Sequence, residues 1–146
     1  MIKESDLQVM VADYLRLQYP DVLFHSDFGS GIKLTMGQAA KQRRQNGGRR
    51  AWPDMFIAHP VVTDIGRTNM QEVRFGLFIE LKREGTRIFK KDGTLVADEH
   101  IREQFDMLEE LRQRGYAAEF ACGFDEAKAI IDNYLGGKSE TGKEIF

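Results

Sequence analysis

The sequence predicts an α/β fold in which a mixed β-sheet is flanked by helices. Segments with helical periodicity alternate with short apolar runs, in the order helix, strand, helix, strand, strand, helix, strand, helix. The two central strands are close enough along the chain to pair as an antiparallel hairpin, and a long helix before the next strand suits a parallel crossover. The 146 residues suffice for one domain, which we expect over residues 1–137, followed by a flexible tail at 138–146.

The N-terminal segment has the apolar periodicity of a helix. Its apolar residues recur at intervals of three and four, which places them on one helical face. Ser5 and Gln8 have the spacing of a capping box, and Pro20 marks the far limit of the helix. A short strand is expected at residues 22–26. The apolar face consists of Leu7, Met10, Val11, Tyr14 and Leu15.

A second helix is expected after a glycine-rich turn at residues 27–31. Thr35 is expected to cap this helix, which runs to about Gln45 and ends at Asn46-Gly47-Gly48. The remaining elements are expected to be strands at 55–58, 75–79 and 116–122, a helix at 98–114, a last helix from a cap at Asp125 to Gly136, and a charged loop at 83–96 that can form a small hairpin.

Composition excludes several classes of site. The single cysteine, Cys122, rules out an internal disulfide and a cysteine-rich zinc site. Cys122 lies in an apolar stretch, so we expect a buried hydrophobic residue rather than a nucleophile. No apolar run approaches the ~20 residues of a membrane span, and the N-terminus has no signal-like pattern. We therefore expect a cytoplasmic protein without a membrane partner.

The charge of the chain is unevenly distributed. The net charge is −2, but from Phe28 to Pro53 there is no Asp or Glu and the charge is +6, which leaves −8 for the rest. Such a segment favours an anionic partner such as a phosphate backbone, although on charge alone a solvated helix face is an equal alternative. Its basic residues are Lys33, Lys41, Arg43, Arg44, Arg49 and Arg50.

Three charged residues stand at the ends of the two central strands. Asp54 opens the first strand, and Glu80 and Lys82 end the second. Being two residues apart in a strand, Glu80 and Lys82 point to the same face, whereas Leu81 points into apolar packing and leaves its carbonyl free to face a metal. Carboxylates suit Mg²⁺, and a lysine beside them can orient water and stabilise charge on a phosphate. The alternative is a plain Glu-Lys pair at a strand end and an unrelated Pro-Asp turn.

Two longer stretches carry a resemblance to a known family. Residues 48–57 (GRRAWPDMFI) and 76–82 (GLFIELK) resemble the PD-(D/E)xK nuclease superfamily and, more narrowly, the VRR-NUC (virus-type replication-repair nuclease) family. The likeness continues through residues 100–104, 116–120, 123–127 and 134–135, and so covers nearly the whole chain. It implies a restriction-endonuclease-like core and a Mg²⁺- or Mn²⁺-dependent deoxyribonuclease of the stand-alone phage or bacterial type.

The resemblance also implies roles for individual residues. Asp54 and Glu80 look like metal-binding carboxylates, Lys82 looks like the catalytic lysine, and the main-chain carbonyl of Leu81 is a further metal ligand. Glu4 matches a family glutamate at the start of the first helix and joins the metal ligands. If the helix reaches back to Glu4, its side chain leans toward the sheet, whereas a capping box would place Glu4 just outside the helix.

The DNA contacts are expected to come from the basic segment and from one glutamine. Gln104 matches a family glutamine on the helix after the lysine, and a partly exposed glutamine without a role is an equal alternative. Trp52 departs from the small apolar residue that is common in the family before Pro53, which leaves the details of the substrate open. Phosphate contacts are expected from Lys41, Arg43, Arg44, Arg49 and Arg50.

Similarity to stand-alone members of the family suggests the substrate and the assembly. It implies an endonuclease that cuts branched DNA, in particular four-way (Holliday) junctions in DNA repair, as a homodimer with two active sites. Two alternatives are a flap or duplex DNA nuclease with the same chemistry, and a DNA-binding module without catalysis.

Overall fold

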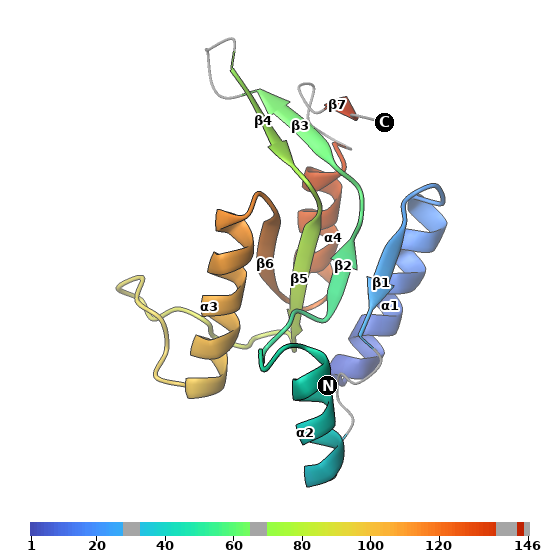
Figure 1. Cartoon of the computed structure of the whole chain (residues 1–146). Coiled ribbons are helices and arrows are strands. Elements are labelled where there is room, and N and C mark those ends of the chain that lie inside the picture. Colours follow the sequence, from blue (N-terminus) through green and yellow to red (C-terminus); the bar gives the residue numbers. More distant parts are fainter. Residues whose placement is uncertain (28–32, 65–69, 137–142, 145–146) are drawn as a thin grey trace.

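The described part of the chain forms a mixed sheet with helices on both faces (Figure 1). The computed structural model describes residues 1–27, 33–64, 70–136 and 143–144. None of the helices within these ranges is long and apolar enough to cross a membrane. The elements are α1 (Glu4–Gln18), β1 (Phe24–Ser26), α2 (Met36–Gln45), β2 (Met55–Ile57), β3 (Val61–Asp64), β4 (Gln71–Arg74), β5 (Leu77–Lys82), α3 (Glu99–Gln113), β6 (Ala117–Cys122), α4 (Phe124–Tyr134) and β7 (Lys143–Glu144).

The main sheet has the strand order β1-β2-β5-β6. β2 pairs antiparallel with both β1 and β5, whereas β5 pairs parallel with β6, with Leu77 opposite Ala117 and Lys82 opposite Cys122. The long helix α3 connects these two parallel strands, because parallel neighbours need a crossover. The predicted mixed sheet, central antiparallel pair and helical crossover are therefore confirmed.

A smaller sheet of three strands, in the order β4-β3-β7, was not predicted. β3 and β4 extend the β2–β5 hairpin beyond the main sheet (Figure 1), where the sequence indicated only a loop. The prediction failed because β4 is polar (Gln-Glu-Val-Arg) and only partly buried, so it has no apolar run. β7 pairs with β3 within the expected tail, and residues 138–142 and 145–146 of that tail lie outside the described residues.

A close contact between backbone and ring explains the glycine that leads from β4 into β5. A Cβ atom at Gly76 would lie 2.5 Å from the ring of Phe56 and 2.9 Å from the carbonyl oxygen of Ile57. Any side chain would therefore push β5 away from β2.

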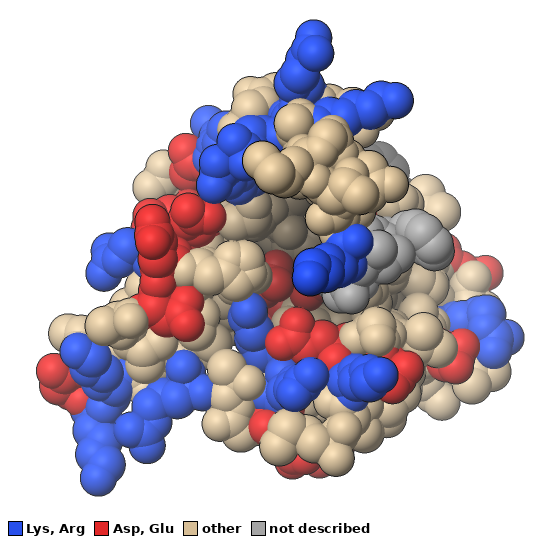
Figure 2. Space-filling view, turned by 90° about the horizontal axis from the view of Figure 1, so that it is seen from below, with Lys and Arg blue, Asp and Glu red and all other residues tan. Residues whose placement is uncertain are grey.

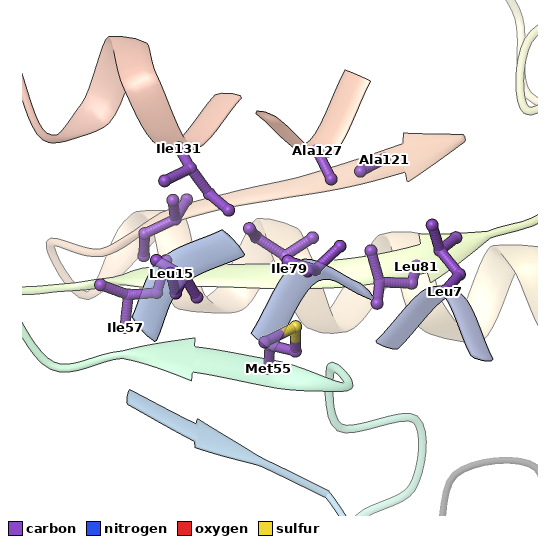
Figure 3. Packing of buried hydrophobic residues seen from close by; sticks show 11 residues of the cluster. Leu7, Leu15, Met55, Ile57, Ile79, Leu81, Ala121, Ala127 and Ile131 are labelled. Carbon is purple, nitrogen blue, oxygen red and sulfur yellow. The ribbon is translucent and has the colours of Figure 1, made fainter. Parts of the chain in front are cut away.

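The main core lies between the sheet and the pair α1 and α4 (Figure 3). Alternate residues of β5 face this core, while Phe78 packs on the opposite face against the smaller cluster under α3. Glu80 and Lys82 share the Phe78 side of the strand by the same alternation. The core residues of β5 and its neighbours are Leu77, Ile79, Leu81, Met55, Ile57 and Ala121, covered by Leu7, Val11, Leu15, Ala127 and Ile131.

Two expected helix caps are corrected by the structure. α1 begins at Glu4 with Lys3 as its N-cap and without a side-chain cap, so the capping box of Ser5 and Gln8 is wrong. Gln8 turns inward instead, because it lies beside Leu7 on the buried side of α1. α4 begins at Phe124 after Gly123, whose φ of 94° suits glycine, so Asp125 lies in the first turn and is not the cap.

Two other local predictions are confirmed. Thr35 caps α2 through a reciprocal capping box with Gln38. In the charged loop, Phe89 and Leu95 form an isolated antiparallel bridge, and the N–H of Lys90 donates to the carbonyl oxygen of Thr94 at 2.7 Å. α2 has no buried residue, which agrees with its polar composition.

Candidate active site

A cavity of about 350 Å³ opens at the end of the sheet where β2 begins and β5 ends. The end-on view shows a hollow with acidic side chains inside it and basic side chains on its rim (Figure 2). It brings together α1, α2, β5 and α3, which are far apart in the sequence. Its lining residues are Glu4, Asp27, Ala39, Gln42, Arg43, Asn46, Arg49, Arg50, Ala51, Trp52, Asp54, Glu80, Lys82, His100 and Gln104.

Asp54 is held at the entry to β2 by contacts from three elements. Its carboxylate accepts a hydrogen bond from the main-chain N–H of Leu81 at 2.8 Å. Its carbonyl oxygen accepts from the N–H of Asp27 at 2.7 Å and from the side-chain amide of Gln8 at 3.4 Å. The amide of Gln8 also donates to the carbonyl oxygen of Asp27 at 3.0 Å. These bonds fix both the backbone and the carboxylate of Asp54.

Glu80 is a buried carboxylate beside Asp54, with only 5% of its surface exposed. Burial raises the pKa of Glu80 well above its usual value, and the negative charge of Asp54 raises it further. A hydrogen bond with the Asp54 side chain and the charge of Glu4 act in the same direction, while the ammonium of Lys82 opposes them. The two carboxylates therefore meet at the floor of the cavity.

Lys82 and Leu81 take the orientations that the strand alternation predicts. Lys82 is 8% exposed and lines the cavity with Glu80, whereas the Leu81 side chain is buried in the opposite core. The N–H and the C=O of one residue in a strand point to the same side. Because the N–H of Leu81 donates to Asp54, its carbonyl is directed toward that side as well.

Glu4 lies inside α1, at its first residue, and lines the same cavity. Of the two placements that the sequence left open, the structure supports the one in which the helix reaches back to Glu4. Its negative charge is the smallest of the causes that raise the pKa of Glu80, after burial and Asp54.

Gln104 is buried on α3, with 5% of its surface exposed, so the partly exposed alternative is wrong. Its side-chain amide donates to Oε1 of Glu80 at 2.7 Å. Nε2 of His100, one turn earlier on α3, lies 3.2 Å from the same amide nitrogen. Oε1 of Gln104 has no hydrogen-bond partner within the described ranges. Gln104 thus positions the Glu80 carboxylate.

The predicted basic residues fall into two groups. Arg43, Arg49 and Arg50 line the cavity, and Arg49 also forms an ion pair with Glu110 of α3. Lys41 and Arg44 are exposed but lie outside the cavity lining. Because this segment contains no acidic residue, the three arginines place positive charge on one rim of the cavity.

Several lining residues were missed by the sequence reasoning. Asp27 and Asn46 come from turns and carry no pattern that marks a site. His100 is one helical turn from Gln104, a spacing that places both on one face, and this signal could have been used. Gln8 does not line the cavity but supports Asp54; its place on the buried face of α1 beside Leu7 is a second usable signal, because buried polar groups need partners.

The arrangement supplies oxygen donors close to positive charge. Among the described side chains, no group of three or more His, Cys, Asp and Glu residues is arranged to hold a metal ion. Mg²⁺, however, is usually bound through one or two carboxylates and keeps several waters. Two carboxylates in contact, one of them with a raised pKa, are a donor set that fits such a cation.

Comparison with known proteins identifies a solved structure with a similar fold. No protein-family model matches the chain, and no curated protein matches it. A solved structure described as "VRR_NUC domain protein" aligns with a TM-score of 0.55 at 22% sequence identity, over 92% of this chain and 89% of that chain. The predicted α/β fold with a mixed sheet between helices is thus confirmed as one that this chain shares with a VRR_NUC domain protein.

Proposed function

We propose that the chain is a metal-dependent nuclease that hydrolyses phosphodiester bonds in DNA. The observation that carries the proposal is the contact between Asp54 and Glu80 at the floor of a cavity whose rim holds three arginines. Burying two carboxylates side by side destabilises the protein unless a cation or a proton offsets their charge. The fold shared with a VRR_NUC domain protein supports the same conclusion.

The carboxylates of Asp54 and Glu80 would hold Mg²⁺ or Mn²⁺, with the carbonyl of Leu81 as a further ligand. Glu4 would contribute from the start of α1. When bound, the divalent cation supplies positive charge for the phosphate and makes water a better nucleophile.

The remaining residues of the site would position the water and the Glu80 carboxylate and neutralise charge on the DNA phosphates. Nζ of Lys82, which lies on the same strand face as Glu80, would donate a hydrogen bond to the attacking water or to a phosphate oxygen. The Gln104 amide keeps the Glu80 carboxylate in one orientation. Arg43 and Arg50 offer charge to the flanking phosphates, which favours binding that depends on salt and not on base sequence.

We further propose branched DNA, in particular four-way junctions, as the substrate, cut by a homodimer. This part rests on the resemblance of residues 48–57 and 76–82 to stand-alone VRR-NUC nucleases. A two-fold dimer would present two such cavities to a nearly symmetric junction.

The test is cleavage of labelled four-way junction, flap and linear duplex DNA in Mg²⁺, Mn²⁺ or EDTA. Asp54→Asn and Glu80→Gln should each abolish cutting while the chain stays folded. Glu119→Gln, which changes an exposed glutamate on β6 outside the cavity, should cut like the parent. Metal-dependent cutting that survives both cavity substitutions would refute the assigned site.

The same assay separates the alternatives. Preference for flap or duplex over junctions would replace the junction proposal but keep the chemistry. DNA binding without cutting under either metal would favour a DNA-binding module. Sedimentation of the protein on junction DNA measures the number of chains bound, and a single chain would contradict the dimer.

A further inference from the structure

Trp52 is the only tryptophan of the chain, and it lines the cavity with 42% of the residue's surface exposed. It stands two residues before Asp54, so their Cα atoms are at most about 7 Å apart. A large aromatic ring is therefore presented to solvent beside the carboxylates. Tryptophan is highly buried on average, so packing alone does not explain why this residue is exposed.

The Trp52 ring packs against other aromatic side chains of the sheet. Its centroid lies 6.2 Å from that of Phe78, with the planes tilted by 50°. Phe78 in turn stacks on Phe56 at 4.4 Å, across the β2–β5 pair. Trp52 is thus anchored against the sheet on one side and open to the cavity on the other.

The backbone before Trp52 is held in an uncommon conformation. Ala51 has a φ of 63°, the only positive φ of a non-glycine residue in the described part of the chain. Side chains disfavour this region, and such backbone strain concentrates at binding and catalytic sites. The turn at Ala51 lies between Arg50 and Trp52, and all three residues line the cavity.

An aromatic face next to arginines is the combination that binds single-stranded nucleic acid. Bases stack on the ring, and the cations hold the phosphates. In a duplex both faces of a base are covered by its neighbours, so only an unpaired or displaced base can use the ring.

We propose that Trp52 is a stacking platform for an unpaired base adjacent to the phosphate that is cut. The substrate class is then DNA with unpaired bases at the cleavage position, such as a branch point or a single-stranded arm. This inference rests on the proposed nuclease function and adds the feature of DNA that the site selects.

Because the chain has one tryptophan, its fluorescence reports on position 52 directly. The Asp54→Asn chain, in which cutting is expected to be lost, is titrated with a thymidine oligonucleotide and with a blunt duplex of equal length. Binding is followed in parallel by the anisotropy of labelled DNA. We expect the oligonucleotide to quench the tryptophan emission strongly and the duplex to quench it little at the same saturation. Equal quenching by both, or binding of the oligonucleotide without quenching, would overturn the proposal.

Substitutions give a second readout. In the same background, Trp52→Ala should weaken oligonucleotide binding by about 5- to 150-fold, the range of one lost base stack. Trp52→Phe keeps a ring and should retain most of the affinity, which separates stacking from a folding defect. Phe89→Ala removes an exposed aromatic side chain that does not line this cavity, and it should bind like the parent. Unchanged affinity in Trp52→Ala would refute the platform.

The two proposals fail in different ways. Metal-dependent cutting of DNA without any response at Trp52 would keep the nuclease and remove the stacking platform. Quenching by the oligonucleotide without cutting by the parent chain under either metal would keep the platform and remove the nuclease. Absence of DNA binding would overturn both.

Discussion

Glu80→Gln tests whether burial of the Glu80 carboxylate beside Asp54 lowers the free energy of unfolding of the metal-free protein. Burial and the neighbouring Asp54 raise the pKa of Glu80 above its ordinary value of 4.5. Between the unfolded and the folded pKa, the native state therefore binds more protons than the unfolded state, and the free energy of unfolding falls as the pH rises. Glutamine has nearly the same shape and does not ionise, so the substitution removes this loss. Its new amide can also donate to the Asp54 carboxylate.

The size of the effect follows from linkage. One group with a raised pKa lowers the free energy of unfolding by about 1.4 kcal/mol for each pH unit between its two pKa values. For a chain of 146 residues, 1 kcal/mol corresponds to a change in Tm of roughly 2–4 °C. The Tm of Glu80→Gln should then exceed that of the parent by an amount that grows by roughly 3–6 °C per pH unit above 4.5 and levels off above the folded pKa. Below 4.5 the two proteins should converge.

The assay is thermal unfolding in EDTA at a series of pH values. Glu119→Gln, an exposed glutamate on the neighbouring strand, is the matched control, and its Tm difference from the parent should stay constant with pH. Parallel curves for Glu80→Gln and the parent, or a lower Tm of Glu80→Gln at neutral pH, would refute the reasoning. Addition of Mg²⁺ or Mn²⁺ at about 100 times its Kd should stabilise the parent by about 2.7 kcal/mol and Glu80→Gln by much less.

Three further predictions follow from single contacts. Gln104→Met removes the 2.7 Å hydrogen bond to Glu80 and should lower kcat with little change in KM. The rise of activity with pH should move to higher pH, because the ionised carboxylate loses a hydrogen-bond donor. An unchanged pH profile of kcat would contradict the positioning role. Arg50→Ala should reduce the slope of log Kd against log salt for duplex DNA by about 0.9, as for one lost phosphate contact, whereas Arg16→Ala on the exposed side of α1 should leave the slope unchanged. Gly76→Ala places a methyl group 2.5 Å from the Phe56 ring and should lower the free energy of unfolding by about 1–3 kcal/mol in urea denaturation, while Gly37→Ala, which meets no atom within 4 Å, should not destabilise.

Local patterns in the sequence were sufficient for the main elements. Period-2 alternation in β5 places Leu81 in the core and Glu80 and Lys82 on the other face, because successive side chains of a strand alternate whatever the rest of the chain does. Periodicity of 3.6 located α1 and α3 for the same reason. The β3–β4 extension was not predicted because β4 is polar and β3 (Val-Val-Thr-Asp) has only two apolar residues, so neither strand has the apolar pattern by which the other strands were located.

The composition of the site depended on contacts between distant residues. Asp54, Glu80 and Lys82 were found from their own strands, whereas the hydrogen bond from Gln104 to Glu80 spans 24 positions and the one from Gln8 to Asp54 spans 46. Such pairs are set by the order of strands in the sheet and by the faces on which α1 and α3 pack.

The sequence by itself determined the helices and strands of the main sheet and its covering layers, and which charged residues stand at the ends of the central strands, since both follow from local periodicity. Only the tertiary structure decided that Glu4 lines the same cavity as the two carboxylates, that Gln104 is buried against Glu80, and that Trp52 lines the cavity. These outcomes required the packing of helices on the two faces of the sheet, whose free energy comes from apolar contacts along the whole chain and is not encoded in any short motif.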